Sequence, residues 1–66
     1  MTIVLNGDRH DVPEPLSVTS LLAHLAIDPR RVAVEVNETV IKRARYDETA
    51  IAPHDRVEIV NFVGGG

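Results

Sequence analysis

Cysteine is absent from the 66-residue sequence, which excludes disulfide bonds and thiolate-ligated metal sites. Any sulfur chemistry in which the chain takes part must therefore use a thiol carried by another molecule. Aromatic side chains are almost as scarce, since Tyr46 and Phe62 are the only two. Stacking platforms for bases or sugars are therefore not expected, and we expect an aliphatic core.

Positive charge is in deficit, because seven Lys and Arg residues against ten Asp and Glu residues leave a net charge of −3. Domains that bind nucleic acid normally carry a basic excess, so this class of protein is not expected.

No apolar run is longer than three residues, which provides neither a membrane span nor the core of a signal peptide. The length favours one domain. We expect a cytoplasmic protein with no nucleic-acid or membrane partner.

The N-terminal residues predict a β-hairpin. Residues 2–5 are rich in β-branched side chains and are followed directly by Asn6-Gly7. Asn-Gly is the strongest short hairpin signal, because both residues accept a positive φ that matches the twist of the flanking strands. Residues 9–12 are predicted to return along the first strand. Pro13 and Pro15 then end the hairpin, because proline cannot donate to a strand ladder.

A short amphipathic helix is predicted to begin after Ser17, a favourable N-cap residue. Its apolar stripe occupies the i, i+3, i+4 and i+7 positions, which are Val18, Leu21, Leu22 and Leu25. Asp28-Pro29 is predicted to end the helix. A helix of about two and a half turns is marginal alone, so we expect it to pack on a sheet.

Two strands and a polar loop are predicted next. In residues 32–37 every second residue is valine, which indicates one buried and one solvated face. Asn37-Glu38 is predicted as a turn into a short strand at 39–41. Residues 42–48 are polar, and we interpret their basic cluster as a solvated loop, with partner binding as the alternative. The cluster consists of Lys42, Arg43 and Arg45. Ile51 is expected to plug the core.

The last predicted strand runs from residue 56 to residue 62 after a turn at Pro53-His54-Asp55. Val57 and Ile59 are expected to face the helix, which leaves Val60 and Phe62 on the open face. Two exposed apolar side chains in this place suggest a docking patch for a partner. The alternative is a bulge that turns one of them inward.

The predicted order of elements is β-β-α-β-β-β, with the fourth strand optional. A helix with one apolar stripe can cover one face of one sheet, which indicates an α+β fold with the first and last strands as neighbours. The side chains expected to point inward are Ile3, Leu5, Val18, Leu21, Leu22, Leu25, Val32, Val34, Val36, Ile51, Val57 and Ile59.

Residues 63–66 are Val63, Gly64, Gly65 and Gly66. Glycine has no Cβ and supplies nothing to bury, so we expect residues 63–66 to form a flexible tail on a domain of residues 1–62. The tail is expected to present the α-carboxylate of Gly66. A frayed end or an expression scar is the alternative interpretation.

Five features together carry a resemblance to a known family. They are the Asn6-Gly7 hairpin, the helix start at Ser17-Val18, the strand and turn at 34–37, the run 55–60 and the Gly65-Gly66 pair. With these features, the chain resembles the ThiS family, the sulfur carriers of thiamine biosynthesis. The resemblance implies a ubiquitin-like β-grasp, in which a mixed four- to five-stranded sheet carries one helix packed on one face. His54 departs from the family, which usually has glycine there, at a position expected to need a positive φ.

The resemblance also implies a function in which the chain is a carrier and not an enzyme. In similar proteins, an E1-like (ThiF-like) adenylyltransferase uses ATP and Mg²⁺ to join the terminal carboxylate to AMP. Sulfur from a persulfide on another protein then displaces AMP, and a ThiG-like thiazole synthase uses the resulting thiocarboxylate. No cofactor is expected on the chain itself.

On this chain, the residue implied to be modified is Gly66, and the tail implied to enter the partner's active site is Gly64, Gly65 and Gly66. The implied docking patch consists of Val60, Phe62 and Val63.

Other functions remain open at this point. Catalysis by the chain is not expected, because its histidines, in a strand, a helix and a turn, show no common ligand spacing. The small subunit of molybdopterin synthase would share the fold and the tail, although such chains tend to be longer. A protein tag joined through Gly66 to lysines, and an inert β-grasp interaction module, are the remaining alternatives.

Overall fold

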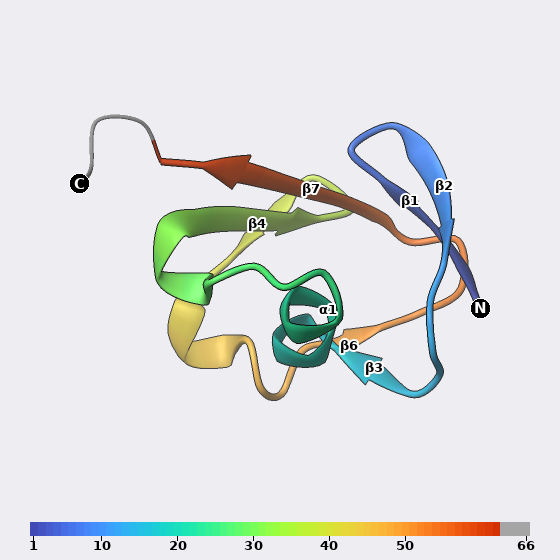
Figure 1. Ribbon diagram of the computed structural model, residues 1–66, viewed down its shortest axis with the longest axis horizontal. Helices are drawn as coiled ribbons and strands as arrows, with labels where there is room; N and C mark the ends of the chain where they lie inside the picture. The colour runs from blue at the N-terminus through green and yellow to red at the C-terminus, as the bar shows by residue number, and fades with distance from the viewer. Residues whose placement is uncertain (63–66) are drawn as a thin grey trace.

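The computed structural model describes residues 1–62, in which a five-stranded mixed sheet has one α-helix packed against it (Figure 1). The strands of this sheet are β1 (Thr2–Leu5), β2 (Asp8–Asp11), β4 (Val32–Val36), β5 (Thr39–Ile41) and β7 (Arg56–Asn61). Their order across the sheet is β2-β1-β7-β4-β5. β1 and β7 are parallel neighbours, and the other pairs are antiparallel. The predicted α+β architecture is confirmed. Val63, Gly64, Gly65 and Gly66 lie outside the described residues.

The N-terminal hairpin forms where the sequence places it. Thr2 pairs with Asp11, and the register continues to the pair that closes a two-residue loop, Leu5 with Asp8. In that loop Asn6 has a φ of 48° and Gly7 a φ of 87°. Both values are positive, as the hairpin turn requires. β2 starts one residue earlier than predicted, because the loop contains only these two residues.

The helix α1 (Val18–His24) begins as predicted but ends earlier. The Ser17 side chain accepts a hydrogen bond from the backbone N–H of Ser20 at 3.0 Å. The predicted stop at Asp28-Pro29 is wrong, because Ala26 adopts a φ of 58° and the Ile27 N–H donates to the Leu22 carbonyl at 2.9 Å. A residue with positive φ and a bond that closes the last turn are the usual end of a helix.

Asp28 and Pro29 instead begin the 3₁₀ helix η1 (Pro29–Arg31), which leads into β4.

A second, two-stranded sheet was not predicted. β3 (Leu16–Ser17) pairs with β6 (Ala50–Ile51), so that Leu16 lies opposite Ile51 and both are buried. Ile51 therefore fills the core, as predicted. The polar segment before β6 contains the 3₁₀ helix η2 (Arg43–Arg45).

The core lies between α1 and the sheet. Its buried members are Ile3, Leu5, Val12, Leu16, Val18, Leu21, Leu22, Val32, Val34, Val36, Tyr46, Ile51 and Val57. The expectation of a purely aliphatic core is wrong at Tyr46, which is only 4% exposed. Its carbonyl accepts from the N–H of Thr19 at 3.2 Å, so the loop that carries Tyr46 docks on the first turn of α1. Leu25 and Ile59 are only partly buried. None of the helices in residues 1–62 has the length and hydropathy of a membrane span.

Candidate functional site

The candidate site is built on β7, the strand that leads to the predicted tail. β7 lies in the middle of the sheet and pairs with β4 along its length, from Val36 opposite Val57 to Val32 opposite Asn61. On the other side, the pairing with β1 ends where Leu5 lies opposite Val57. The second half of β7 therefore lacks a strand on that side.

Asn6 takes the place of the missing strand. Its side-chain amide accepts from the Ile59 N–H at 2.8 Å and donates to the Ile59 carbonyl at 3.3 Å. Its own backbone N–H donates to the Val57 carbonyl at 2.9 Å. The side chain of one turn residue thus continues the hydrogen-bond ladder beyond the end of β1 and fixes the path of β7.

Asn37 fixes the first residue of β7 from the opposite side. Its backbone N–H donates to the Arg56 carbonyl at 2.7 Å, and its side-chain oxygen accepts from the Arg56 N–H at 3.0 Å. Its side-chain nitrogen also donates to the Asp55 carboxylate at 3.0 Å. Asn37 has a φ of 50°, so both asparagines combine a turn conformation with a clamp on β7.

A third contact holds the far end of the strand. The Phe62 N–H donates to the Arg31 carbonyl at 2.9 Å. Arg31 belongs to η1, and the carboxylate of Asp28 caps the start of this helix. That carboxylate accepts hydrogen bonds from the backbone N–H of Arg30 at 2.9 Å and from the guanidinium of Arg30 at 3.0 Å. The side-chain and backbone hydrogen bonds from Arg30 lower the pKa of Asp28 to about 2. The main chain that leads to residue 63 therefore leaves from a fixed point.

The open face of the sheet carries the predicted apolar patch. Val60 is 55% exposed and Phe62 is 51% exposed, and β7 pairs with β4 without a bulge through Asn61. The alternative in which a bulge buries one of them is therefore wrong. Their role as a docking patch stays a prediction, and Val63, the third predicted member, lies outside the described residues.

Val40 belongs to the same face and was missed from the sequence. It is 66% exposed and lies opposite Glu35 in the β4–β5 pair. The signal was present, because Ile41 pairs with the buried Val34, and alternation along β5 then sends Val40 to the other face. Among residues 1–62, the exposed large apolar side chains are Val40, Val60 and Phe62.

The described residues contain no cluster of metal-ligating side chains. Among residues 1–62, no three His, Cys, Asp or Glu side chains are grouped so that they could hold a metal ion. His10, His24 and His54 are exposed and come from β2, α1 and the turn before β7. His54 adopts a φ of 69°, which confirms the positive φ expected there. This part of the molecule provides a firmly held strand whose open face carries Glu58, Val60 and Phe62.

Comparison with known proteins identifies the family. The family model described as "ThiS family" matches residues 3–66. The chain belongs to the ThiS family. The crystal structure of the thiamine biosynthesis protein ThiS from Geobacter metallireducens superposes with a TM-score of 0.88, at 38% identity and with 100% of both chains covered. The ThiS fold, with its ubiquitin-like β-grasp, is therefore confirmed.

Two relatives of this ThiS family chain differ in name, since one is a sulfur carrier protein and the other a thiazole synthase. The sulfur carrier protein ThiS of Bacillus subtilis is 40% identical over 50 residues, which cover 76% of each chain. The thiazole synthase of Paramagnetospirillum magneticum is 38% identical over 66 residues, which are 100% of this chain and 20% of that protein. The chain thus spans about a fifth of the length of the thiazole synthase that it matches.

Proposed function

We propose that this chain is a sulfur carrier of thiamine biosynthesis and that its reactive group is the main-chain carboxyl group of Gly66. The observation that carries the proposal is the family match, which extends through residue 66 and so includes the Gly65-Gly66 pair. The folded part is consistent with it, because hydrogen bonds from Asn6, Asn37 and Arg31 hold β7 up to residue 62. The chain is then a handle, and its partners perform the chemistry.

The chemistry follows from the reactivity of a carboxylate. In a chain that ends at Gly66, the α-carboxylate is ionised at neutral pH and is a poor electrophile. An E1-like (ThiF-like) adenylyltransferase converts it to an acyl adenylate with ATP and Mg²⁺, and pyrophosphate leaves. A protein persulfide then attacks the carbonyl carbon, and AMP leaves. A second thiol cleaves the sulfur–sulfur bond, which releases the thiocarboxylate and leaves a disulfide. All of the sulfur comes from partners, because this chain has no cysteine.

Partner enzymes recognise two parts of the chain, the C-terminal glycines and the docking patch on the sheet. Gly64, Gly65 and Gly66 lack a Cβ and can enter a channel too narrow for any larger residue. Val60, Phe62 and Val63 form the docking patch, and Val40 is exposed on the same face of the sheet, beyond β4. The thiocarboxylate is passed to a ThiG-like thiazole synthase in the cytoplasm. A similar segment within a thiazole synthase supports this partner, because domains that work together are often joined in one chain.

Intact mass tests the proposal directly. The chain, its cognate adenylyltransferase, ATP, Mg²⁺ and a persulfide donor are combined, and the same mixture without ATP is the control. A gain that equals the exchange of one oxygen for sulfur is expected only with ATP. A ladder of conjugated proteins would instead indicate a protein tag. A stable heterodimer with a larger pterin-processing subunit would indicate the molybdopterin synthase subunit, and an unchanged mass would indicate an inert module.

A further inference from the structure

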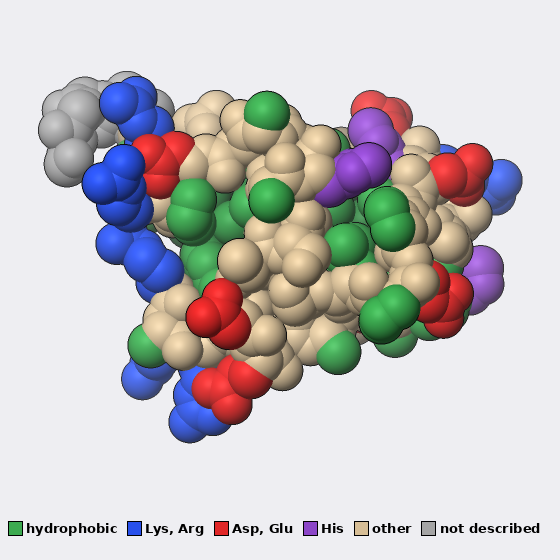
Figure 2. All heavy atoms as spheres, turned by 60° about the horizontal axis from the view of Figure 1, so that its bottom comes forward, with side chains coloured by type: hydrophobic (Ala, Val, Ile, Leu, Met, Phe, Trp, Pro, Cys, Tyr) green, Lys and Arg blue, Asp and Glu red, His purple; other side chains and the backbone are tan. Residues whose placement is uncertain are grey.

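The charges of the chain are segregated along the molecule. Four of its seven cationic side chains lie on η1 and η2, and a fifth, Lys42, is the N-cap residue of η2. Both 3₁₀ helices occupy the end of the molecule where β7 finishes (Figure 1). Figure 2 shows these blue side chains gathered along that end. This basic end consists of Arg30, Arg31, Lys42, Arg43 and Arg45.

Acidic side chains do not neutralise the basic end. Asp28, Asp47 and Glu48 lie beside it, so five cations against three carboxylates give this end a charge of +2. Two cations against seven carboxylates give the rest of the chain a charge of −5. A chain whose net charge is −3 therefore presents a positive surface at one end only. Such a separation orients a molecule as it approaches a charged partner.

The basic end adjoins the point from which the tail departs. The Phe62 N–H donates to the carbonyl of Arg31, so the last described residue of the chain is bonded to η1 itself. A protein that takes up the residues after Phe62 must therefore approach beside η1 and its neighbour η2.

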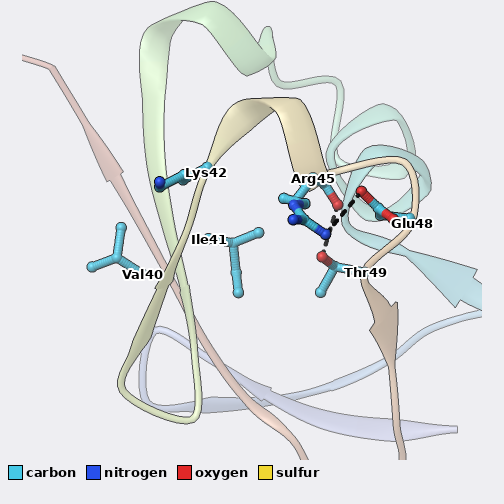
Figure 3. Close-up of a pocket in the computed structure, with 6 residues that line it drawn as sticks. All are labelled: Val40, Ile41, Lys42, Arg45, Glu48 and Thr49. Atoms are coloured by element: carbon cyan, nitrogen blue, oxygen red, sulfur yellow. Dashed lines mark hydrogen bonds and ion pairs between the residues drawn. The ribbon is translucent and has the colours of Figure 1, made fainter.

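A groove next to β5 continues the basic end toward the edge of the sheet (Figure 3). Its volume is about 480 Å³, and it is lined by Val40, Ile41, Lys42, Arg45, Glu48 and Thr49. Figure 3 shows Ile41 at the centre, with Lys42 on one side and the Arg45–Glu48 pair on the other. Within residues 1–62, β5 is an edge strand whose one partner is β4.

The cations at this groove are available to a partner. Lys42 and Arg43 are exposed, and neither forms an ion pair with any residue of the described range 1–62. Arg45 pairs with Glu48 at 3.5 Å, and both side chains are more than 60% exposed (68% and 62%). Exposed pairs of this kind contribute little to stability, so Arg45 can exchange Glu48 for another carboxylate.

We propose that the basic end docks an acidic surface of the adenylyltransferase, with a segment of that enzyme rich in Asp and Glu lying in the groove beside β5. The inference rests on the proposed function, because it names the surface by which that partner positions the tail. Opposite charges on the two surfaces steer the encounter, and salt screens the attraction. The negative charge of the rest of the carrier disfavours the reverse orientation, in which the hairpin of β1 and β2 would meet the acidic surface.

Charge reversal tests the inference by kinetics. The double variant Lys42→Glu/Arg43→Glu is compared with Arg9→Glu, which reverses an exposed cation on β2 at the opposite edge of the sheet. The initial rate of adenylation is measured against carrier concentration at low and high salt. The double variant is expected to raise KM about tenfold at low salt with kcat unchanged, and Arg9→Glu to raise it less than about twofold. High salt is expected to raise the KM of the wild type and to reduce the difference in KM between the double variant and Arg9→Glu.

Lys42 also allows a positional test, because it is the single lysine of the sequence. A carbodiimide joins an amine to a carboxylate without a spacer, so a Lys42 amine seated on an acidic segment becomes linked to Asp or Glu of the enzyme. Lys42→Arg is the matched control, since it keeps the charge and removes the amine. It is expected to keep the wild-type KM and to lose the cross-link.

The outcomes separate the two proposals. Equal KM values for the double variant and Arg9→Glu, or a cross-link from Lys42 to a second copy of the chain or to no enzyme carboxylate, would overturn the docking inference. The thiocarboxylate would still form in that case, and the sulfur-carrier function would stand. If the wild-type chain gains no sulfur, the function fails and the docking inference falls with it. Circular dichroism of each variant establishes that the compared chains are folded.

Discussion

Asn6 is predicted to stabilise the fold through its side-chain bonds to β7 as well as through its turn conformation. The side-chain amide makes two hydrogen bonds to Ile59, a residue 53 positions away along the chain. Both bonds are exposed to solvent, so water can replace them, and each contributes about 0.5–1 kcal/mol. Asn6→Gly removes both bonds but keeps the positive φ accessible. It should therefore lower the free energy of unfolding by about 1–2 kcal/mol.

Two further variants separate the clamp from the turn. Gly7→Ala introduces a Cβ that meets no atom within 4 Å, so its cost of about 1–2 kcal/mol comes only from the φ of 87°. Asn6→Ala loses the clamp and also forces alanine into a positive φ. Its cost should approach the sum of the other two, about 2–4 kcal/mol.

Urea unfolding followed by far-UV circular dichroism gives the three free energies, and hydrogen exchange locates the effect. In Asn6→Gly the amide of Ile59 should exchange faster than global unfolding predicts. The amide of Ile27, which is bonded to the Leu22 carbonyl, should follow global stability and serves as the internal control. The reasoning is refuted if Asn6→Gly leaves both the unfolding midpoint and the Ile59 exchange unchanged, or if Gly7→Ala alone accounts for the cost of Asn6→Ala.

Three further predictions concern the patch, the cap and the turn. Phe62→Asp and Val60→Asp should change the free energy of unfolding by less than about 0.5 kcal/mol, because both side chains are exposed. They should nevertheless raise the KM for the adenylyltransferase about tenfold or more. A KM equal to that of the wild type would show that these side chains are not a docking patch. Asp28→Asn should lower Tm at pH 7, because the pKa of Asp28 falls from its ordinary 3.8 to about 2 in the folded chain. That stabilisation is present above pH 3.8 and is lost as the pH falls through about 2. The difference in Tm between wild type and variant should therefore shrink steadily across this range, and a difference that stays the same from about pH 5 to below about pH 2 would contradict the assignment. His54→Gly should raise the free energy of unfolding by about 0.5–1 kcal/mol, because glycine adopts the φ of 69° without strain. A lower free energy of unfolding in urea would instead show that the histidine side chain makes a stabilising contact of its own.

Local patterns in the sequence determined much of the fold. The positive φ values at Asn6 and Gly7, the cap at Ser17 and the alternation of β4 were all predicted, because each depends on residues close together in the chain. The end of α1 was mispredicted, because alanine at residue 26 gives no signal for the positive φ that it adopts. The pairing of β3 with β6 joins segments more than 30 residues apart, and neither is long enough to show a period.

The parts of the candidate site that depend on the alternation of side chains along a strand were predicted. The parts that depend on contacts between residues far apart in the sequence were missed. The exposure of Val60 and Phe62 follows from the period of β7 alone. Asn6 and Asn37 were interpreted only as turn residues, and their bonds to β7 depend on how the sheet assembles. The groove beside β5 was equally hidden, because it forms between β5 and the segment that η2 folds back over α1.

In the proposed mechanism the folded part only presents the C-terminus, and the main-chain carboxyl group of Gly66 is the group that reacts. The decisive measurement is the intact mass, after the complete sulfur-transfer reaction, of a chain ending at Gly66 beside a chain extended by one alanine. Both chains should show the same urea unfolding, and only the chain ending at Gly66 should exchange an oxygen for sulfur. If the extended chain acquires sulfur to the same extent, the reactive group lies elsewhere and the carrier mechanism is wrong.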